Sequence, residues 1–291
     1  MALAKKSLIS TALWRGVLSI LLFLVLWELG SRSRHWLIQE EFEWMRNLLA
    51  MAGWEKKYLP WIGPIPAPSE VLKAWGGVIG DIGYWHSWYK SFSRVAGGFI
   101  AAMIIGIPFG LLLAVSRTAF GIGFPVFEVL RPIPPLAWVP ASIIFWPTQE
   151  LSITFVTFLG AFYTIVINVV GGAKSIDLRY FQAAQSMGSS SWDIFRRIIL
   201  PGTLPSIMVG SAVGMGITWE VVVAAEMISG GGSQIGGTAG GGLGFFIWNS
   251  YVGGSYEQIV VGMISIGIAG FISSELLRSL GKYVTPWLRL R

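Results

Sequence analysis

Long apolar stretches alternate with polar segments along most of the chain. A helix that crosses the hydrocarbon core of a bilayer needs about 20 mostly apolar residues, and several stretches come close to that length. The six candidate spans are Leu13–Leu29, Val95–Val115, Ile122–Trp146, Leu151–Val170, Ser206–Ile228 and Ile259–Leu277. The pattern therefore predicts an all-α, polytopic membrane protein with six transmembrane helices.

The third apolar stretch is interrupted by prolines at Pro132, Pro134, Pro135 and Pro140. Proline lacks the backbone N–H that an α-helix uses and breaks or kinks the helix. A broken helix is tolerated inside a bilayer only where its freed carbonyl groups face protein or a water-filled cavity. We therefore expect this stretch to line the interior of the protein.

A polar segment, residues 31–91, separates the first apolar stretch from the second and is expected to be extracytoplasmic or interfacial. Within it, Glu40–Trp54 places apolar side chains among charges, which is typical of an amphipathic helix on a membrane surface. A small packed helix outside the membrane is the alternative. The prolines of Pro60–Pro68 favour an extended linker, and Glu70–Ile82 predicts another short amphipathic helix.

The composition supports a membrane protein. Of the 291 residues, 54% are hydrophobic and only 12% are charged, whereas about a quarter of the residues in soluble domains are charged. The 15 tryptophans suit two interfacial belts. The absence of cysteine excludes disulfides and Cys-based metal sites, and His35 and His86 have no partners at ligand spacing, so we expect no metal site.

The basic residues indicate the orientation of the chain. The net charge of +6 comes without the basic stripe typical of nucleic-acid binding, so no nucleic-acid partner is expected. Lys and Arg gather at the N-terminus, near Arg117, in the loop after the fourth span and in the C-terminal tail, whereas loops 147–150 and 229–258 have none. The positive-inside rule then predicts that both termini are cytoplasmic. No small-residue cleavage site follows the first span, which we interpret as an uncleaved helix.

The sequence thus divides into an N-terminal end with the first span (1–30), the polar segment described above, and a core of five spans (92–291). One polar loop of this core, residues 177–201, has the pattern of two short helices. The first contains the small residues Ala183 and Ala184 and is expected to stop at Gly188.

The second helix of the loop is expected to open near Ser191 with a serine cap. Asp193 lies in its first turn, where a negative charge favours the helix dipole. We expect Leu200-Pro201 to end it before the next span. Two such helices would form a cytoplasmic projection whose alanines let a partner's backbone approach closely.

This loop resembles the EAA loop of ABC-importer permeases, whose pattern is Glu-Ala-Ala, three residues, Gly, nine residues, Ile, any residue, Leu-Pro. The positions that match are Ala183, Ala184, Gly188, Ile198, Leu200 and Pro201. Gln182 stands where the family usually has Glu, which removes a charge but keeps a hydrogen-bond acceptor. Segments 130–140, 219–227 and 242–244 are similar to the nitrate/sulfonate/taurine/bicarbonate branch, and the long 40–64 insertion is most like its nitrate and bicarbonate permeases.

The resemblance implies a type I ABC-importer permease with a MetI-like fold in a bacterial inner membrane. Two copies of the chain would form the translocation path for a small oxyanion, nitrate or bicarbonate. Two ATPase subunits, identical or not, would grip the loop, bind ATP and Mg, and perform the catalysis, so this chain would have no cofactor or catalytic site of its own. An extracytoplasmic binding protein would deliver the substrate. The alternatives are a sulfonate or taurine permease and an ion-gradient-driven secondary carrier.

Several residues within the spans are candidates for the translocation path, because an ionisable group in a membrane is costly to bury and often functional. The candidates are Arg131, Pro134, Pro135, Trp138, Trp219, Glu220 and Glu226. Arg131 could attract an anion, cap broken carbonyls or pair with Glu128 three residues earlier. The two tryptophans favour packing, and for Glu226 a structural role is favoured.

The glycine-rich run 230–244 has no Gly-Lys-Ser/Thr ending and follows no predicted strand, so it does not predict nucleotide binding. We interpret it as a flexible external loop. Gly242, Leu243 and Gly244 at its end are candidates for docking the binding protein.

Overall fold

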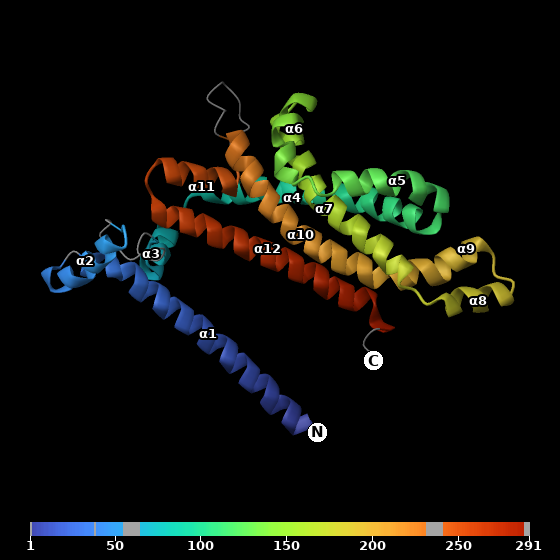
Figure 1. The fold of residues 1–291 in the computed structure, drawn as a ribbon, viewed down its shortest axis with the longest axis horizontal. Helices are drawn as coiled ribbons and strands as arrows, with labels where there is room; N and C mark the ends of the chain where they lie inside the picture. Colours follow the sequence, from blue (N-terminus) through green and yellow to red (C-terminus); the bar gives the residue numbers. More distant parts are fainter. Residues whose placement is uncertain (1, 38, 55–64, 231–240, 288–291) are drawn as a thin grey trace. The chain divides into compact units, whose positions relative to one another are not determined.

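The computed structural model describes residues 2–37, 39–54, 65–230 and 241–287, and within these ranges every regular element is helical (Figure 1). The elements are α1 (Ala2–Trp36), η1 (Glu40–Phe42), α2 (Glu43–Met51), α3 (Pro68–Val78), α4 (Ile82–Val115), α5 (Arg117–Leu130), η2 (Pro135–Trp138), α6 (Val139–Phe145), α7 (Gln149–Lys174), α8 (Leu178–Ser186), α9 (Ser191–Ile194), η3 (Phe195–Ile199), α10 (Leu200–Gly230), α11 (Leu243–Val252) and α12 (Tyr256–Val284). The predicted all-α class is confirmed.

Helices long and apolar enough to cross a membrane occur at five places in the described ranges. They are Trp14–Ser33, Ile82–Val115, Gln149–Lys174, Ser191–Ser229 and Tyr256–Val284. The remaining predicted span, the proline-rich one, is divided into α5, η2 and α6. The five long helices and this broken one correspond to the six predicted spans.

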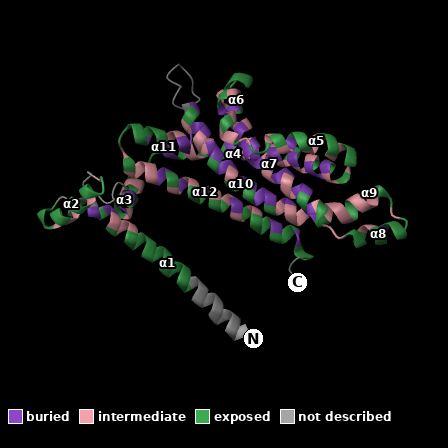
Figure 2. Cartoon of the chain, viewed as in Figure 1, coloured by how far each residue is buried: buried purple, intermediate pink, exposed green. Residues whose placement is uncertain are grey.

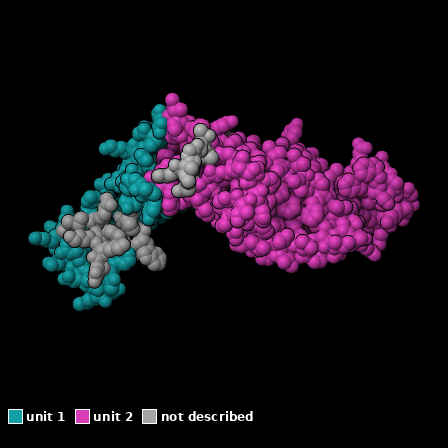
Figure 3. Space-filling view, turned by 90° about the horizontal axis from the view of Figure 1, so that it is seen from above, with its two compact units in different colours: residues 1–81, 250–261 teal, residues 82–249, 262–291 magenta. Residues whose placement is uncertain are grey.

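The chain forms two compact units (Figure 3). Unit 1 consists of Met1–Asp81 and Ser250–Val261, and unit 2 of Ile82–Asn249 and Gly262–Arg291. The division into 1–30, 31–91 and 92–291 stays a prediction.

Unit 2 is organised around α7, which packs against both α4 and α10. Most of the buried side chains of α7 are small or β-branched, among them Val156, Ala161 and Val169. Gly98 of α4 brings the two backbones together, because a Cβ atom there would overlap the side chain of Thr157. Membrane helices pack through such small residues, since water supplies no hydrophobic driving force between them.

Helix α4 begins at Ile82, so the predicted start of this span at Val95 was too late. The helix includes Lys90 and Arg94, which the prediction treated as part of a polar connection. Carboxylates of unit 2 pair with both side chains. This pairing lowers the cost of placing the two charges in a membrane-spanning helix.

In unit 1, α3 packs against α1. Glu28 of α1 accepts hydrogen bonds from the backbone N–H of Ser69 at 3.1 Å and from its hydroxyl at 2.8 Å, which ties the two helices together. Figure 2 shows the described part of α1 as mostly exposed until its C-terminal end. The exposed side chains of this span include Leu22, Val25 and Leu26, which is expected of a helix that faces lipid.

The predicted helices of the polar segment are present as η1 and α2 within Glu40–Trp54 and as α3 within Glu70–Ile82, although α3 begins earlier, at Pro68. α2 has no buried residue, which favours the interfacial interpretation over a packed helix. Most of the predicted linker Pro60–Pro68 lies outside the described residues, as does most of the glycine-rich run 230–244.

Candidate functional site

The predicted two-helix loop is formed by α8 and α9, which project as a pair from unit 2 where α7 ends and α10 begins (Figure 1). The side chain of Asp177 caps α8 by accepting a hydrogen bond from the backbone N–H of Arg179 at 2.9 Å. The Arg179 side chain also donates to Asp177, and these hydrogen bonds lower the pKa of the Asp177 carboxyl. The cap therefore stays ionised and fixes the start of α8.

The end of α8 follows the prediction. Gly188 adopts a φ of +74°, in the left-handed region where a side chain is strained. This turn lets the N–H of Ser189 donate to the carbonyl of Ala184 at 3.0 Å, which satisfies a carbonyl group at the helix end. The backbone conformation at this position thus favours glycine.

The second helix opens as predicted, with the Ser190 hydroxyl accepting from the N–H of Asp193 at 3.2 Å. The predicted end at Leu200-Pro201 was wrong. α9 continues through the π-helical turn η3 directly into α10, and the N–H of Leu200 donates to the carbonyl of Phe195. The wider turn accommodates the proline, which cannot donate a helical hydrogen bond. α9, η3 and α10 therefore form one continuous helix.

The outer surface of this helix pair suits a protein partner. Gln182 and Ala183 are exposed, whereas Ala184 is buried, and Ile198, Leu200 and Pro201 are half-buried. Large apolar side chains are also exposed, at Leu178, Tyr180, Met187 and Trp192. Contiguous exposed apolar patches mark interaction sites, and these four side chains are the candidates for such a contact on the helix pair.

A cavity of about 680 Å³ separates the helix pair from the bundle. Its walls include Val115 of α4, Ala173 of α7, Phe181 of α8 and Trp192 of α9. The cavity leaves space between the helix pair and the ends of α4 and α7.

At the ends of the spans away from the helix pair, the structure brings together a group of charges whose grouping the sequence analysis missed. We call Lys90, Ser91, Arg94, Glu150 and Glu226 the Arg94 ion-pair cluster. Arg94 donates to both carboxylate oxygens of Glu150, at 2.6 and 2.7 Å, and to Glu226 at 2.8 Å. Lys90 adds a contact of 3.3 Å to Glu150. The cluster joins α4, α7 and α10 by paired charges.

The burial of these groups differs strongly. The side chains of Arg94 and Glu226 are 2% and 0% exposed, whereas that of Glu150 is 43% exposed. Glu226 also accepts hydrogen bonds from the Ser91 hydroxyl at 2.8 Å and from the N–H of Gly244 at 2.9 Å. A buried carboxylate is tolerated only when it is paired and hydrogen-bonded in this way. The structural role favoured for Glu226 is therefore the one that the geometry supports.

The segment that starts α11 wraps around the same carboxylate. Arg94 donates to the carbonyl of Gly241 at 2.7 Å, and the N–H of Leu243 donates to Ser91 at 2.8 Å. A Cβ atom on Gly242 would overlap the Glu226 carboxylate, and Leu243 is fully buried. Gly242, Leu243 and Gly244 therefore pack against the cluster, and their docking of a binding protein stays a prediction.

One signal in the sequence could have revealed this cluster. Lys90 and Arg94 are four residues apart, one helical turn, and they directly precede an apolar run. Glu150 and Glu226 lie at span ends on the predicted extracytoplasmic side. The pairing itself depends on the packing of three helices that are distant in sequence.

The remaining path candidates lie in several environments. Arg131 pairs with Glu128 at 2.6 Å, and both side chains are 41% exposed. Trp219 is buried and its Nε1 donates to Ser273 at 2.9 Å, as expected of a packing residue. Glu220 is exposed on α10.

Around the broken span, Pro134 is exposed and Pro135 is half-buried. Trp138 is half-buried, and its Nε1 has no hydrogen-bond partner in the described part of the chain. Among the described residues, no group of three or more His, Cys, Asp or Glu side chains could hold a metal ion. The lining of a path by these residues stays a prediction.

Comparison with known proteins identifies the family. Residues 106–290 match the family described as binding-protein-dependent transport system inner membrane component. The nitrate import permease protein NrtB of Leptolyngbya laminosa is 36% identical over 67% of this chain and 67% of its own length. The taurine transport system permease protein TauC of Escherichia coli is 32% identical over 82% of this chain and 86% of its own.

Structural comparison supports the same fold. An inward-facing structure of the MetNI methionine ABC transporter aligns with a TM-score of 0.54 and 21% identity, over 70% of this chain and 94% of the other. A putative ABC transporter permease of Methanocaldococcus jannaschii, MJ0413, is 32% identical over 83% of this chain and 90% of its own length.

Proposed function

Because the chain belongs to the binding-protein-dependent transport system inner membrane component family, we propose that this ABC-importer permease subunit forms the path for a small inorganic oxyanion, nitrate or bicarbonate. The observation that carries the transport mechanism is the continuity of α9 with α10 through η3. A partner that moves the helix pair would move a transmembrane helix with it. ATP hydrolysis in partner subunits would drive import.

The proposed assembly contains two copies of this chain, two ATPase subunits and an extracytoplasmic binding protein. The exposed Gln182 and Ala183 and the exposed apolar side chains of the helix pair support an ATPase contact there. ATP would favour one of two conformations of the ATPase pair, and the docked helix pairs would pass that preference to the spans. Both termini would be cytoplasmic, on the side of the helix pair, in a bacterial inner membrane.

Nitrate is supported by the identity of 36% and 35% to two nitrate permeases, over 67% and 68% of this chain. An alkanesulfonate or taurine is the second candidate, because the taurine permease matches a larger share of this chain at similar identity. Both kinds of substrate have anionic oxygens, so an exposed cation along the path could serve either.

Reconstitution of the permease with its ATPase and binding-protein partners in liposomes tests the proposal. We expect ATP-dependent uptake of isotope-labelled nitrate or bicarbonate that excess unlabelled taurine does not inhibit. Uptake of taurine with no uptake of either inorganic anion would favour the second candidate. Uptake that persists without ATP but collapses with an ionophore would contradict the ATP-driven mechanism.

A further inference from the structure

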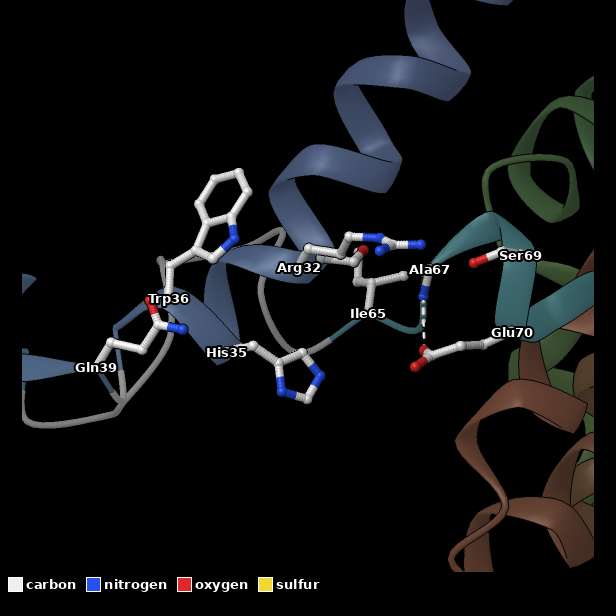
Figure 4. A pocket seen from close by; sticks show the side chains of 9 residues that line it. Arg32, His35, Trp36, Gln39, Ile65, Ala67, Ser69 and Glu70 are labelled. Atoms are coloured by element: carbon white, nitrogen blue, oxygen red, sulfur yellow. Dashed lines mark hydrogen bonds between the residues drawn. The ribbon is translucent and has the colours of Figure 1, made fainter.

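A polar cavity of about 410 Å³ lies in unit 1 at the C-terminal end of α1. Its lining includes Ser31, Arg32, His35 and Trp36 of α1 and Glu70 of α3. Figure 4 shows Arg32 and His35 from α1 and Glu70 from α3 around the same space. The cavity has no part in the transport mechanism derived above.

The hydroxyl group of Ser31 is the first sign of a ligand. Ser31 is 6% exposed, and its Oγ is buried with no hydrogen-bond partner in the described ranges. A buried hydroxyl without a partner costs about 1–3 kcal/mol, and such groups are rare in native structures. Since Ser31 lines the cavity, a molecule in the cavity could supply the missing acceptor.

Two further donors line the same space. The Nε and Nη2 atoms of Arg32 both contact Glu28 at 2.8 Å, and Nη1 has no protein partner among the described residues. The ring of His35 also has no hydrogen-bond partner within that part of the chain. A guanidinium group, a hydroxyl and an imidazole that line one cavity suit a phosphate group.

The cavity also offers a negative charge. Oε2 of Glu70 accepts from the backbone N–H of Ala67 at 3.0 Å, whereas Oε1 has no partner among the described residues. A carboxylate oxygen beside phosphate-binding donors would repel a simple anion but would pair with an ammonium group. The combination selects a zwitterion that contains both phosphate and ammonium.

The position of the cavity indicates where such a zwitterion comes from. The span of α1 ends at Ser33, so the cavity lies at the level of lipid headgroups, just beyond the hydrocarbon. A second, apolar cavity of about 300 Å³ is lined by Leu37, Phe42 and Met45 and shares Trp36 with the first. A headgroup in the polar cavity could place its acyl chain in the apolar one.

We propose that unit 1 binds one phosphatidylethanolamine molecule at this site. Ser31, Arg32 and His35 hold its phosphate, Glu70 accepts a hydrogen bond from its primary ammonium group, and Trp36 separates the headgroup from an acyl chain. The lipid would anchor the junction of α1 and α3 to one leaflet. The proposal is independent of which anion the importer carries.

Native mass spectrometry of the full-length, delipidated protein titrated with phosphatidylethanolamine tests the site. We expect Ser31→Ala to weaken binding about fivefold through loss of one hydrogen bond. Arg32→Gln should weaken it about tenfold or more through loss of a charged one. Glu70→Gln should remove the preference for phosphatidylethanolamine over phosphatidylglycerol. Lys73→Gln, a charge removal on α3 outside the cavity, is the matched control and should bind as the parent does.

The thermal stability of the lipid-free proteins distinguishes loss of the site from loss of the fold. Ser31→Ala removes a buried hydroxyl with no protein partner, so the lipid-free variant should be at least as stable as the parent. If Arg32→Gln does not fold, the lipid affinity of Ser31→Ala alone tests the site. Equal binding by Ser31→Ala and the parent would overturn the proposal. Displacement of the lipid by millimolar inorganic phosphate would overturn the proposal in favour of a free-phosphate site. Binding of phosphatidylcholine and phosphatidylglycerol as tightly as phosphatidylethanolamine would overturn it in favour of an unselective lipid surface.

Discussion

Replacement of Arg94 by methionine tests whether the Arg94 ion-pair cluster stabilises the bundle. The substitution keeps an unbranched side chain but removes the hydrogen bonds to Glu150, Glu226 and Gly241. Glu150 is 43% exposed and can be hydrated, but Glu226 is fully buried and would lose the guanidinium group that lies 2.8 Å from its carboxylate. Breaking one partner of a buried pair costs about 3–5 kcal/mol.

The loss of unfolding free energy in Arg94→Met comes mainly from the unpaired charge of Glu226. A second substitution that removes this charge should therefore offset part of the loss. Glu226→Gln removes the charge and keeps an oxygen acceptor for Ser91 and the N–H of Gly244. In the Arg94→Met background it should therefore recover part of the lost free energy of unfolding. A double-mutant cycle with both single variants isolates this coupling, which we expect to be about 1–3 kcal/mol.

The free energy of unfolding is measured by denaturant titration in mixed micelles, with far-UV circular dichroism and intrinsic tryptophan fluorescence as probes. The matched control is Arg131→Met, which breaks a pair with Glu128 at a similar distance but with both side chains 41% exposed. Exposed pairs contribute about 0–1 kcal/mol. If Arg94→Met costs no more than Arg131→Met, or if the two cluster substitutions are additive, the cluster does not act as a buried ion pair.

Three further predictions concern the helix pair and the path. Ala183→Trp places a large side chain on the exposed face of α8, and it should abolish co-purification with the ATPase subunits while thermal stability is unchanged; retained association would contradict the docking surface. Gly188→Ala forces a side chain into φ +74° and should cost about 1 kcal/mol and lower transport, whereas Gly188→Asn, which tolerates this region, should cost less; equal stability of all three proteins would refute the strain. Arg131→Ala should lower anion uptake in vesicles and leave assembly intact, and unchanged uptake would exclude an anion contact there.

Much of the fold was determined by the sequence alone, because the bilayer imposes length and polarity on each span. The apolar stretches predicted the long helices, and the prolines predicted the division of the third span between α5 and α6. The glycine at Gly188 and the cap before Asp193 also followed from local rules, since each depends on the backbone of a few neighbouring residues. The end of α9 did not, because a π-helical turn let the helix continue past a proline signal.

The tertiary structure alone decided which charges belong together. Arg94 was placed outside its span by the hydropathy pattern, and Glu226 was left between a path role and a structural one. Packing of α4 and α10 against α7 brings Arg94 to Glu150 and Glu226, and the start of α11 closes over them. The cost of burying a charge can be read from its position in the sequence, but the partner that offsets this cost comes from a distant helix. Only the packed bundle brings that partner within hydrogen-bond distance.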